Sequence, residues 1–429
     1  MLTIAFPKLW SENLFPDLSG LLRSMIRVGR LTVIDARGCA QDFGDHRTGP
    51  WVKLRFHDRT LPLRLLLNPS LAFGEAYVDG RLTFERGSVS DLLDMASQGF
   101  GAIDNHPLQR LRVKLSRFFA QRNHLRRARD NVAHHYDLSG KLYDLFLDAD
   151  RQYSCAYFAR GDETLEEAQQ DKKRHLAAKL LLKPGCDVLD IGSGWGGLAL
   201  DLAQTEGANV TGITLSTEQL ETARNRASAA GLAHRVRFEL RDFRDEQGRY
   251  DRIVSVGMLE HVGSQDYSTF FRRVARALKP DGVALVHSIG RMDPPGAADP
   301  WISKYIFPGG YVPALSEVIA AVEKAGLWIT DVEVWRMHYA ETLRHWRERF
   351  QARRSEAKEI YDERFCRMWE FYLAASEAMF RNGTLMVFQI QLAHRRDAAP
   401  LTRDYISNYR APSTETITPA LSAIKQAGP

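Results

Sequence analysis

The stretch that decides the fold is VLDIGSGWGG, residues 188–197. It begins as an apolar run of the kind that forms a buried strand and then becomes rich in glycine. GGLALDLAQ, residues 196–204, follows directly and is typical of a helix. Glycine permits a sharp turn and lets a ligand approach the backbone closely, where a Cβ would collide. The stretch therefore predicts a nucleotide-like ligand at the N-terminus of this helix.

Strands and helices alternate from residue 180 onward. Apolar, strand-like runs are found at 187–191, 209–215, 236–240, 251–256 and 282–289. Helical patterns lie between them, most clearly at 217–230 and 267–278. This alternation predicts a parallel sheet with helices on both faces. The later part of the chain adds a strand at 327–335, helices at 315–325, 342–356 and 364–381, and a last strand at 384–392.

Three interpretations fit the glycine pattern. Gly192, Gly194 and Gly197 satisfy G-x-G-x-x-G, which also occurs in nicotinamide dinucleotide folds and is weak by itself. The acid that would bind a ribose at the tip of the second strand is absent, because that tip reads GITLST and Glu218 already lies in the next helix. The loop also lies in mid-chain, and a late strand follows long helices. An S-adenosylmethionine-dependent methyltransferase is favoured over a dinucleotide enzyme and over glycines that only pack a helix on a strand.

Composition places the chain among ordinary globular proteins. Its 429 residues suggest two or three domains, and 44% are hydrophobic and 26% charged. It has no apolar run of about 18 residues, and its N-terminus does not read as a signal peptide. The cysteines are widely spaced and form no metal-ligand pattern, so no metal is expected: Cys39, Cys155, Cys186 and Cys366. These features predict a cytoplasmic protein.

Four regions are predicted along the chain. Residues 1–102 form an accessory domain that is β-rich, with extended runs at 31–34, 52–56 and 61–67 and a helix at 89–97. Residues 103–130 form a basic linker helix. Residues 131–396 form the catalytic domain, an α/β Rossmann-like methyltransferase fold whose mostly parallel sheet ends in a late antiparallel strand. Residues 397–429 form a loop-like tail.

The linker at 103–130 is strongly basic. Asp104 and Asp130 are outnumbered there by eight cations, Arg110, Arg112, Lys114, Arg117, Arg122, Arg126, Arg127 and Arg129. Leucines and phenylalanines recur among them at near-helical spacing. Such a helix can lie on an anionic membrane surface. It can equally be a linker packed on its neighbours with solvated charges.

Several further motifs resemble one family. The sequence resembles the cyclopropane-fatty-acyl-phospholipid synthases and their mycolic acid relatives in VLDIGSGWGG (188–197), GITLSTEQ (212–219), YDRIVSVGMLEHVG (250–263) and NVAHHYDLSGKLYDLFLDADRQYSCAYF (131–158). The match runs through most of 131–392. FGEAYVDG at 73–80 is a looser match to members that have an accessory domain.

The resemblance implies a site for S-adenosylmethionine. Tyr153 and Ser154 would touch its methionine end, the TLSTEQ segment its ribose, and the RDF segment its adenine. An aspartate can accept a hydrogen bond from the adenine amine, and an aromatic ring can border the base. Ordinary packing and turn chemistry is the alternative. The predicted cofactor residues are Tyr153, Ser154, Asp190, Gly192, Gly194, Trp195, Gly196, Thr214, Leu215, Gln219, Asp242 and Phe243.

The resemblance also implies a base. An alkene is a poor nucleophile, so the sulfonium methyl must be held in line with it in a dry pocket. The carbocation that results must lose a proton to close a ring. In the resembled family bound bicarbonate takes that proton, and the matching residues here are Glu260, His287 and Tyr339, with the backbone around Cys155 and Ile289. Glu260 would accept the bicarbonate hydroxyl proton, while His287 and Tyr339 would donate to the anion.

Structural alternatives exist for each of these residues. Glu260 can be a cap or an ion-pair partner, His287 a satisfied structural histidine, and Tyr339 half-buried packing. Cys155 is expected only to line the site, because no His–Asp arrangement supports a nucleophile. The aromatic insertion at 291–310, with Trp301, is expected to be a lid over an acyl tunnel or a surface loop with a minor core of its own. Aromatic residues upstream would line the same cavity: Tyr136, Tyr143, Phe146, Tyr157 and Phe158.

The predicted function is that of a cyclopropane-fatty-acyl-phospholipid synthase. It would act on an unsaturated phospholipid at the inner face of the membrane, bound peripherally, as a possible homodimer and without nucleic acid. One alternative is a lipid C-methyltransferase of the same family that methylates without ring closure. A non-catalytic lipid- or cofactor-binding protein would have no use for a base site, and a methyltransferase for polar substrates would need a polar pocket.

Overall fold

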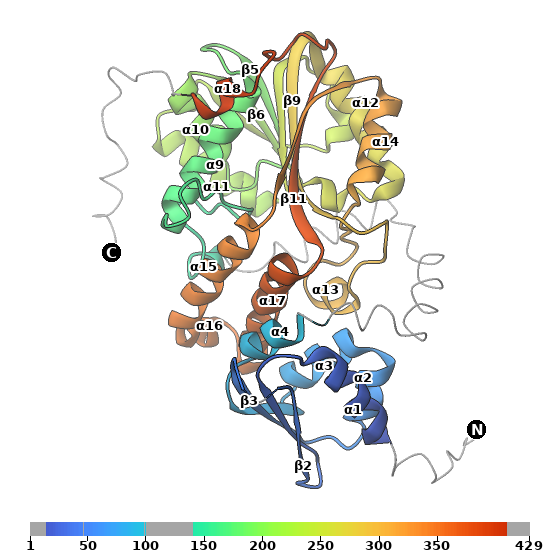
Figure 1. The fold of residues 1–429 in the computed structure, drawn as a ribbon. Coiled ribbons are helices and arrows are strands. Elements are labelled where there is room, and N and C mark those ends of the chain that lie inside the picture. Colours follow the sequence, from blue (N-terminus) through green and yellow to red (C-terminus); the bar gives the residue numbers. More distant parts are fainter. Residues whose placement is uncertain (1–13, 46, 98, 100–139, 410–429) are drawn as a thin grey trace, which may run out of the picture. The chain divides into compact units, whose positions relative to one another are not determined.

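The computed structural model describes residues 14–45, 47–97, 99 and 140–409 (Figure 1). The chain forms two compact units, each made of several segments. The first, here the N-terminal unit, comprises Met1–Ala120, Gly296–Pro308 and Leu343–Thr384. The second, here the sheet unit, comprises Gln121–Pro295, Gly309–Thr342 and Leu385–Pro429. The predicted boundaries at residues 102, 130 and 396 stay predictions, and the predicted basic helix at 103–130 lies outside the described residues.

The sheet unit contains a seven-stranded sheet in the order β10-β11-β9-β8-β5-β6-β7. Five neighbouring strands are parallel: β5 (Asp187–Ile191), β6 (Asn209–Thr214), β7 (Val236–Leu240), β8 (Tyr250–Val256) and β9 (Leu278–Arg291). β11 (Leu385–Ala393) pairs antiparallel with β9, and β10 (Trp328–Trp335) pairs antiparallel with β11. The predicted Rossmann-like fold with a late antiparallel strand is confirmed.

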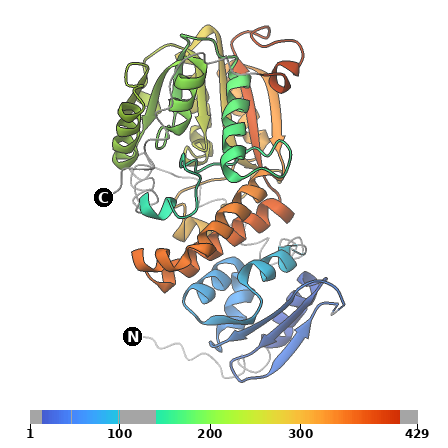
Figure 2. The same cartoon turned by 90° about the vertical axis from the view of Figure 1, so that its left-hand side faces the viewer.

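Helices cover both faces of this sheet, as Figures 1 and 2 show. One face packs on α9 (Leu165–Leu180), α10 (Gly197–Glu206) and α11 (Thr217–Ala229), and the other on α12 (Tyr267–Ala277) and α14 (Leu315–Ala325). Successive side chains of a strand point to opposite faces. In β5, Val188 joins the first core while Leu189 and Ile191 join the second. An apolar run without polar alternation is what a strand buried on both faces needs.

Shorter elements complete the sheet unit. α8 (Gly140–Tyr143) precedes the loop that contains Tyr153, and α18 (Asp404–Ser407) lies near the end of the described chain. The prediction of a wholly loop-like tail from residue 397 is therefore wrong for this one turn. The predicted helix at 342–356 is two helices, because the backbone leaves helical geometry at Arg353. α15 (His338–Ala352) begins in the sheet unit and continues into the N-terminal unit, and α16 (Arg354–Ile360) lies in the N-terminal unit.

The N-terminal unit has a four-stranded sheet in the order β2-β1-β3-β4. Its strands are β1 (Arg30–Ile34), β2 (Ala40–Phe43), β3 (Trp51–Phe56) and β4 (Leu82–Arg86), and its first helices are α1 (Leu14–Met25), α2 (Leu61–Leu67), α3 (Pro69–Val78) and α4 (Val89–Ser97). The predicted strand at 61–67 is wrong. Pro62 lies in the first turn of a helix, where its missing N–H costs nothing, and Leu61 and Leu65, four residues apart, are buried.

Segments from the far end of the sequence complete this unit. α13 (Pro300–Tyr305) and α17 (Glu363–Asn382) pack on α3. Trp301 is fully buried, and its ring lies 4.5 Å from that of Phe371, centroid to centroid. Trp301 therefore packs in the N-terminal unit and not in a core of the 291–310 segment's own, and the lid over an acyl tunnel stays a prediction. Lys304 Nζ donates to Glu75 Oε1 at 2.6 Å, which anchors α13 from its exposed side.

Gly74 provides a test of this packing. A Cβ built there would lie 2.4 Å from Trp301 Cδ1 and 2.8 Å from Phe371 Cε1, closer than real contacts allow. We expect Gly74→Ala to cost about 1–3 kcal/mol, as overpacking of a core does. The measurement is thermal unfolding followed by circular dichroism. Gly20→Ala is the matched control, since nothing lies within 4 Å of its Cβ position. Equal melting temperatures for Gly74→Ala and the unmodified chain would contradict the packing of Trp301 on α3.

Candidate functional site

The turn after β5 has a backbone that only glycine adopts easily. Gly192, Gly194 and Gly196 have φ values of 85°, 53° and 84°. The N–H groups of Gly192 and Ser193 both donate to Ile213 O of β6, at 2.9 and 3.0 Å. The chain reverses there and enters α10, whose first residue is Gly197. The turn thus leaves backbone at the helix N-terminus open to a ligand.

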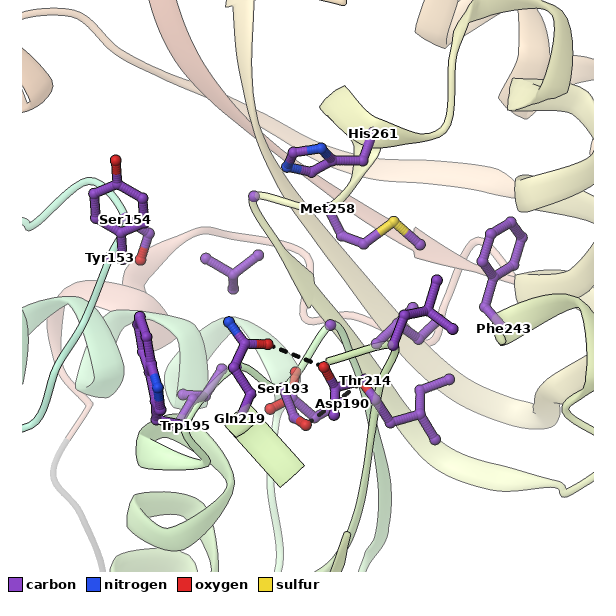
Figure 3. A pocket seen from close by; sticks show the side chains of 18 of the residues that line it. Tyr153, Ser154, Asp190, Ser193, Trp195, Thr214, Gln219, Phe243, Met258 and His261 are labelled. Carbon is purple, nitrogen blue, oxygen red and sulfur yellow. Dashed lines mark hydrogen bonds between the residues drawn. The ribbon is translucent and has the colours of Figure 1, made fainter. Parts of the chain in front are cut away.

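A cavity of about 190 Å³ lies beside this turn, at the carboxyl ends of β5, β6 and β8. Figure 3 shows Tyr153, Ser154 and Trp195 on one side of it and Phe243 on the other. Of the predicted cofactor residues, those that line it are Tyr153, Ser154, Asp190, Gly192, Gly194, Trp195, Thr214, Leu215, Gln219, Asp242 and Phe243. Gly196 does not; it precedes α10 and faces Phe238, which lies 2.6 Å from where a Cβ would stand.

The segment that contains Tyr153 and Ser154 is tied to two helices. Lys173 of α9 donates to the Asp150 carboxylate at 3.0 Å, and Arg226 of α11 pairs with the same carboxylate. Arg226 also donates to Trp195 O at 2.8 Å. One ion cluster therefore connects the glycine turn to the segment that contains Tyr153 and Ser154, and so fixes this side of the cavity.

The next wall comes from β6 and the start of α11. Thr214 Oγ1 donates to Gln219 Oε1 at 3.0 Å (Figure 3). Ser216 caps α11, its hydroxyl accepting from the Gln219 N–H at 3.3 Å, which fixes where that side chain starts. Glu218 accepts from the indole N–H of Trp195 at 3.1 Å. Glu218, the acid nearest the tip of β6, therefore holds a tryptophan of the wall.

Asp242 and Phe243 stand together at the far side. Asp242 Oδ1 accepts from the backbone N–H of Arg244 at 2.9 Å and from its Nε at 2.8 Å. The same guanidinium lies 5.4 Å from the Phe243 ring centroid. Asp242 Oδ2 also accepts from Arg244, so both oxygens of this carboxylate are oriented by one guanidinium.

Glu260 is a buried carboxyl whose two oxygens differ in their hydrogen bonding. It lies in the 3₁₀ turn η3 (Leu259–His261), is 8% exposed, and its Oε1 accepts from the N–H of Ile289 at 2.6 Å. Its Oε2 is buried and has no hydrogen-bond partner among the described residues. Burial raises the pKa of Glu260 to about 7, and the hydrogen bond from Ile289 offsets only part of that rise.

His287 of β9 is neutral and held in one tautomer. Burial lowers its pKa to about 3. The Gln389 amide nitrogen, on the paired residue of β11, lies 3.1 Å from His287 Nδ1. An amide N–H can only donate, so Nδ1 accepts and the ring proton sits on Nε2. The ring edge-packs on Trp335, with centroids 5.1 Å apart. His287 therefore has one donor to offer a ligand.

The other predicted catalytic residues, Cys155 and Tyr339, are buried as well. Burial raises the pKa of the Cys155 thiol, which keeps it protonated and makes it a poor nucleophile. The next residue, Ala156, donates its N–H to Thr342 Oγ1 at 3.0 Å. Thr342 lies in α15, one turn after Tyr339, which is 7% exposed. The structure thus joins Glu260 to Ile289 directly, and links the segment of Cys155 to the helix that contains Tyr339.

Two groups of residues remain to be placed. Tyr143 and Phe146 are fully buried and pack on Tyr153, and neither they nor Tyr157 and Phe158 line the cavity at the glycine turn. That these four line an acyl cavity stays a prediction, and Tyr136 lies outside the described residues. Conversely, the lining residues that sequence reasoning missed include Gln152, Lys172, Met258 and His261. Met258 and His261 flank Glu260 within MLEHVG, so that motif was a usable signal.

The raised pKa of Glu260 predicts a pH-dependent stability. Its value is about 7 in the folded protein against 4.5 for a free glutamate, so its contribution to stability is present below pH 4.5 and lost as the pH rises to about 7. Glu260→Gln removes the buried charge and keeps an acceptor for Ile289. We expect the variant to melt above the unmodified chain at pH 8, with the difference gone near pH 4.5. Glu221→Gln, at an exposed site on α11, should show no such trend. A pH-independent difference for Glu260→Gln would refute the assignment.

Comparisons with known proteins point in one direction. The profile of a family described as mycolic acid cyclopropane synthetase matches residues 123–390. A family described as a domain of unknown function matches residues 30–102.

Individual relatives agree with the family match. "Probable fatty acid methyltransferase" of Pseudomonas putida is 38% identical over 339 residues, covering 76% of this chain and 83% of the relative. "Cyclopropane-fatty-acyl-phospholipid synthase" of Escherichia coli K12 is 39% identical over 327 residues, covering 76% and 84%. Among solved structures, the cyclopropane synthase MmaA2 from Mycobacterium tuberculosis has a TM-score of 0.59 at 35% identity, covering 62% of this chain and 98% of that one. Mycolic acid cyclopropane synthase CmaA1 complexed with SAH and CTAB has a TM-score of 0.59 at 34% identity, covering 62% and 97%.

Proposed function

Because this chain belongs to the mycolic acid cyclopropane synthetase family, we propose that it is a cyclopropane-fatty-acyl-phospholipid synthase. In this proposal it transfers a methylene from S-adenosylmethionine to the cis double bond of an unsaturated phospholipid acyl chain. The observation that carries the proposal is Oε2 of Glu260, which is buried and has no hydrogen-bond partner among the described residues. An acceptor left in this way can take a donor from a ligand.

The cofactor half of the site fits S-adenosylmethionine, the methyl donor of this class of enzyme. Oδ2 of Asp190 is buried and accepts no hydrogen bond from the described part of the chain, and it lies beside a glycine turn that leaves backbone open. Asp242 and Phe243 offer an acceptor and a ring at the far wall, as an adenine requires. When bound, the cofactor supplies an electrophilic methyl group.

The second half of the site fits a small oxyanion that acts as a base. Addition of a methyl to an alkene leaves a cation, and ring closure requires a proton to leave the added carbon. Two of the side chains predicted for this site are unsuited to take that proton: the Cys155 thiol stays protonated, and the His287 lone pair on Nδ1 is occupied by Gln389. We infer that bicarbonate takes it.

The protein's part is to hold that bicarbonate. Glu260 accepts the bicarbonate hydroxyl proton through Oε2, while His287 donates from Nε2 and Tyr339 from its phenol. A free oxygen of the anion then faces the substrate as general base. Glu260 must be ionised to accept, and its pKa of about 7 places that ionisation near neutral pH. Burial of all three residues excludes water, which would otherwise capture the cation.

A phospholipid substrate requires access to a membrane surface. Within the part of the chain that the structure describes, we find no helix long and apolar enough to cross a membrane. We propose peripheral association with the cytoplasmic face, with the basic segment 103–130 as its contact. Eight cations there against two aspartates suit an anionic lipid surface.

A second candidate function is methylation without ring closure. It is favoured by the names of two relatives, "Probable fatty acid methyltransferase" of P. putida and "Tuberculostearic acid methyltransferase UfaA1" of M. tuberculosis, the latter 43% identical over 275 residues. The same cation is formed in both reactions, but its proton leaves from different carbons. Ring closure needs the base next to the added methyl, which is where the proposed Glu260 site would place it.

The function is tested with purified protein, S-adenosylmethionine and vesicles of an unsaturated phospholipid. We expect the fatty acids to gain the mass of one methylene and to resist ozonolysis. A gain with the double bond retained would support the second candidate. No lipid product, from protein that binds S-adenosylhomocysteine normally, would refute both.

Glu260→Gln separates chemistry from cofactor binding. Because the introduced amide would keep the bond to Ile289 but replace the unpartnered acceptor with a competing N–H, we expect turnover to fall at least about 100-fold. Calorimetry should show S-adenosylhomocysteine affinity within about twofold of the unmodified chain. Glu221→Gln, on the exposed face of α11, should change neither quantity. Comparable losses of turnover and affinity would place Glu260 in the cofactor site instead.

A further inference from the structure

Lys172 is a buried cation in the wall of the cavity. It lies on α9 and is 0% exposed, and its Nζ donates to Gln152 Oε1 and Ser154 Oγ, both at 2.8 Å. Both partners are neutral. Among the described residues no carboxylate lies within 4.0 Å of its ammonium. An ammonium has three donors, so one N–H remains for a ligand.

The neighbouring buried lysines of the same helix differ in this respect. Lys173 pairs with Asp150 at 3.0 Å and Asp201 at 3.2 Å, and Lys179 pairs with Asp331 at 3.1 Å and with Glu333. A buried charge without a counter-ion is costly. Burial lowers the pKa of Lys172 to about 8, which still leaves it mostly charged at pH 7. A counter-ion that arrives with a ligand would remove this cost.

Asp190, in the same cavity, is an acceptor that lacks a donor among the described residues. It is the fourth residue of β5, its carboxyl is 2% exposed, and Oδ2 has no partner among the described residues. Burial raises its pKa to about 7, and the charge of Lys172 partly opposes that rise, so the two groups are within electrostatic reach. One end of the cavity therefore offers an unused cationic donor and an unused acceptor.

A ligand that satisfies both must carry an anion and a cationic donor close together. The α-amino acid end of S-adenosylmethionine is such a zwitterion. We propose that Lys172 binds the α-carboxylate of the cofactor and that Asp190 accepts a hydrogen bond from its α-ammonium. Ser154, whose hydroxyl accepts a hydrogen bond from Lys172, lies on the side of the cavity away from Phe243 (Figure 3). The inference rests on the cofactor and is independent of the lipid substrate.

Bicarbonate is a second oxyanion that the charge of Lys172 would attract. Lys172 also lowers the pKa values of His287 and Cys155, so it is within electrostatic reach of the proposed bicarbonate site. The cofactor carboxylate is favoured because Lys172 and both of its hydrogen-bond partners line the cavity of the glycine turn, whereas Glu260 and His287 do not. The experiment distinguishes the two anions.

The test compares two ligands that differ only in the amino acid end. S-adenosylhomocysteine has it, whereas 5′-methylthioadenosine keeps the adenosine and thioether without it. For Lys172→Met we expect S-adenosylhomocysteine to bind about 10- to 100-fold more weakly, as loss of a charge-assisted hydrogen bond implies. Methylthioadenosine affinity should change less than about twofold. The measurement is titration calorimetry in bicarbonate-free buffer, repeated with added bicarbonate.

Two variants control for charge and for buried structure. Lys172→Arg keeps the cation and should retain most of the preference for S-adenosylhomocysteine. Lys179→Met removes a buried lysine of the same helix that is paired elsewhere, and it should lower the melting temperature without changing the affinity ratio of the two ligands. A third ligand, the S-adenosylhomocysteine analogue that lacks only the carboxylate and keeps the amine, requires no variant. Unmodified protein should bind S-adenosylhomocysteine more tightly than this decarboxylated analogue.

Three outcomes would overturn the inference. Equal weakening of both ligands by Lys172→Met would mean that the lysine only supports the wall of the cavity. An affinity ratio that falls only when bicarbonate is added would assign the charge to bicarbonate. Equal binding of S-adenosylhomocysteine and its decarboxylated analogue by the unmodified protein would remove the carboxylate contact altogether.

Discussion

Ionisable side chains that are buried with part of their hydrogen-bonding capacity unused are the constraint on which the site depends. Asp190, Glu260 and Lys172 are each almost fully buried, and each retains hydrogen-bonding capacity that no described residue uses. Burial shifts the pKa of every one of them toward the neutral form. Such an arrangement weakens the fold on its own and becomes favourable when charged ligands complete it. The site is thus built for ligands at the expense of stability.

The surrounding structure keeps these groups in place. The glycine turn joins β5 to α10 in a backbone that other residues rarely adopt, and the cluster of Asp150, Lys173 and Arg226 connects this turn to the segment that contains Tyr153 and Ser154. The pairing of β11 with β9 places Gln389 on His287 and so fixes the tautomer of that ring. The late antiparallel strand therefore has a chemical role as well as a structural one.

Much of the fold could be predicted because its signal is local. Strands buried on both faces have continuous apolar runs, and the glycine turn has a pattern of its own. Residues 61–67 were misassigned because a run of leucines fits a strand or a helix equally, and only Pro62 and the burial of Leu61 and Leu65 decide it. The place of Trp301 was open because its partner Phe371 lies 70 positions away in sequence.

The site could be predicted as far as its motifs extend. Most of the expected cofactor residues lie in segments with a recognisable pattern and line one cavity. Lys172 could not be predicted as a site residue, because its role depends on its surroundings in the fold. In the sequence it is one of two adjacent lysines on a charged helix. Only the fold shows that Lys173 has carboxylate partners while Lys172 has none among the described residues. Protonation states likewise follow from burial, which no motif records.

The central claim is that the proton lost in the reaction comes from the carbon that the cofactor delivers. It is tested most directly with S-adenosylmethionine whose transferred methyl carries three deuterium atoms, incubated with unsaturated phospholipid vesicles. Loss of one proton from the added carbon predicts a product that keeps two of the three deuteriums, both on a ring carbon. The mass and NMR spectra of the isolated fatty acid would show them. A product that keeps all three, on a methyl branch, would show that the proton left the acyl chain and would contradict ring closure at the Glu260 site.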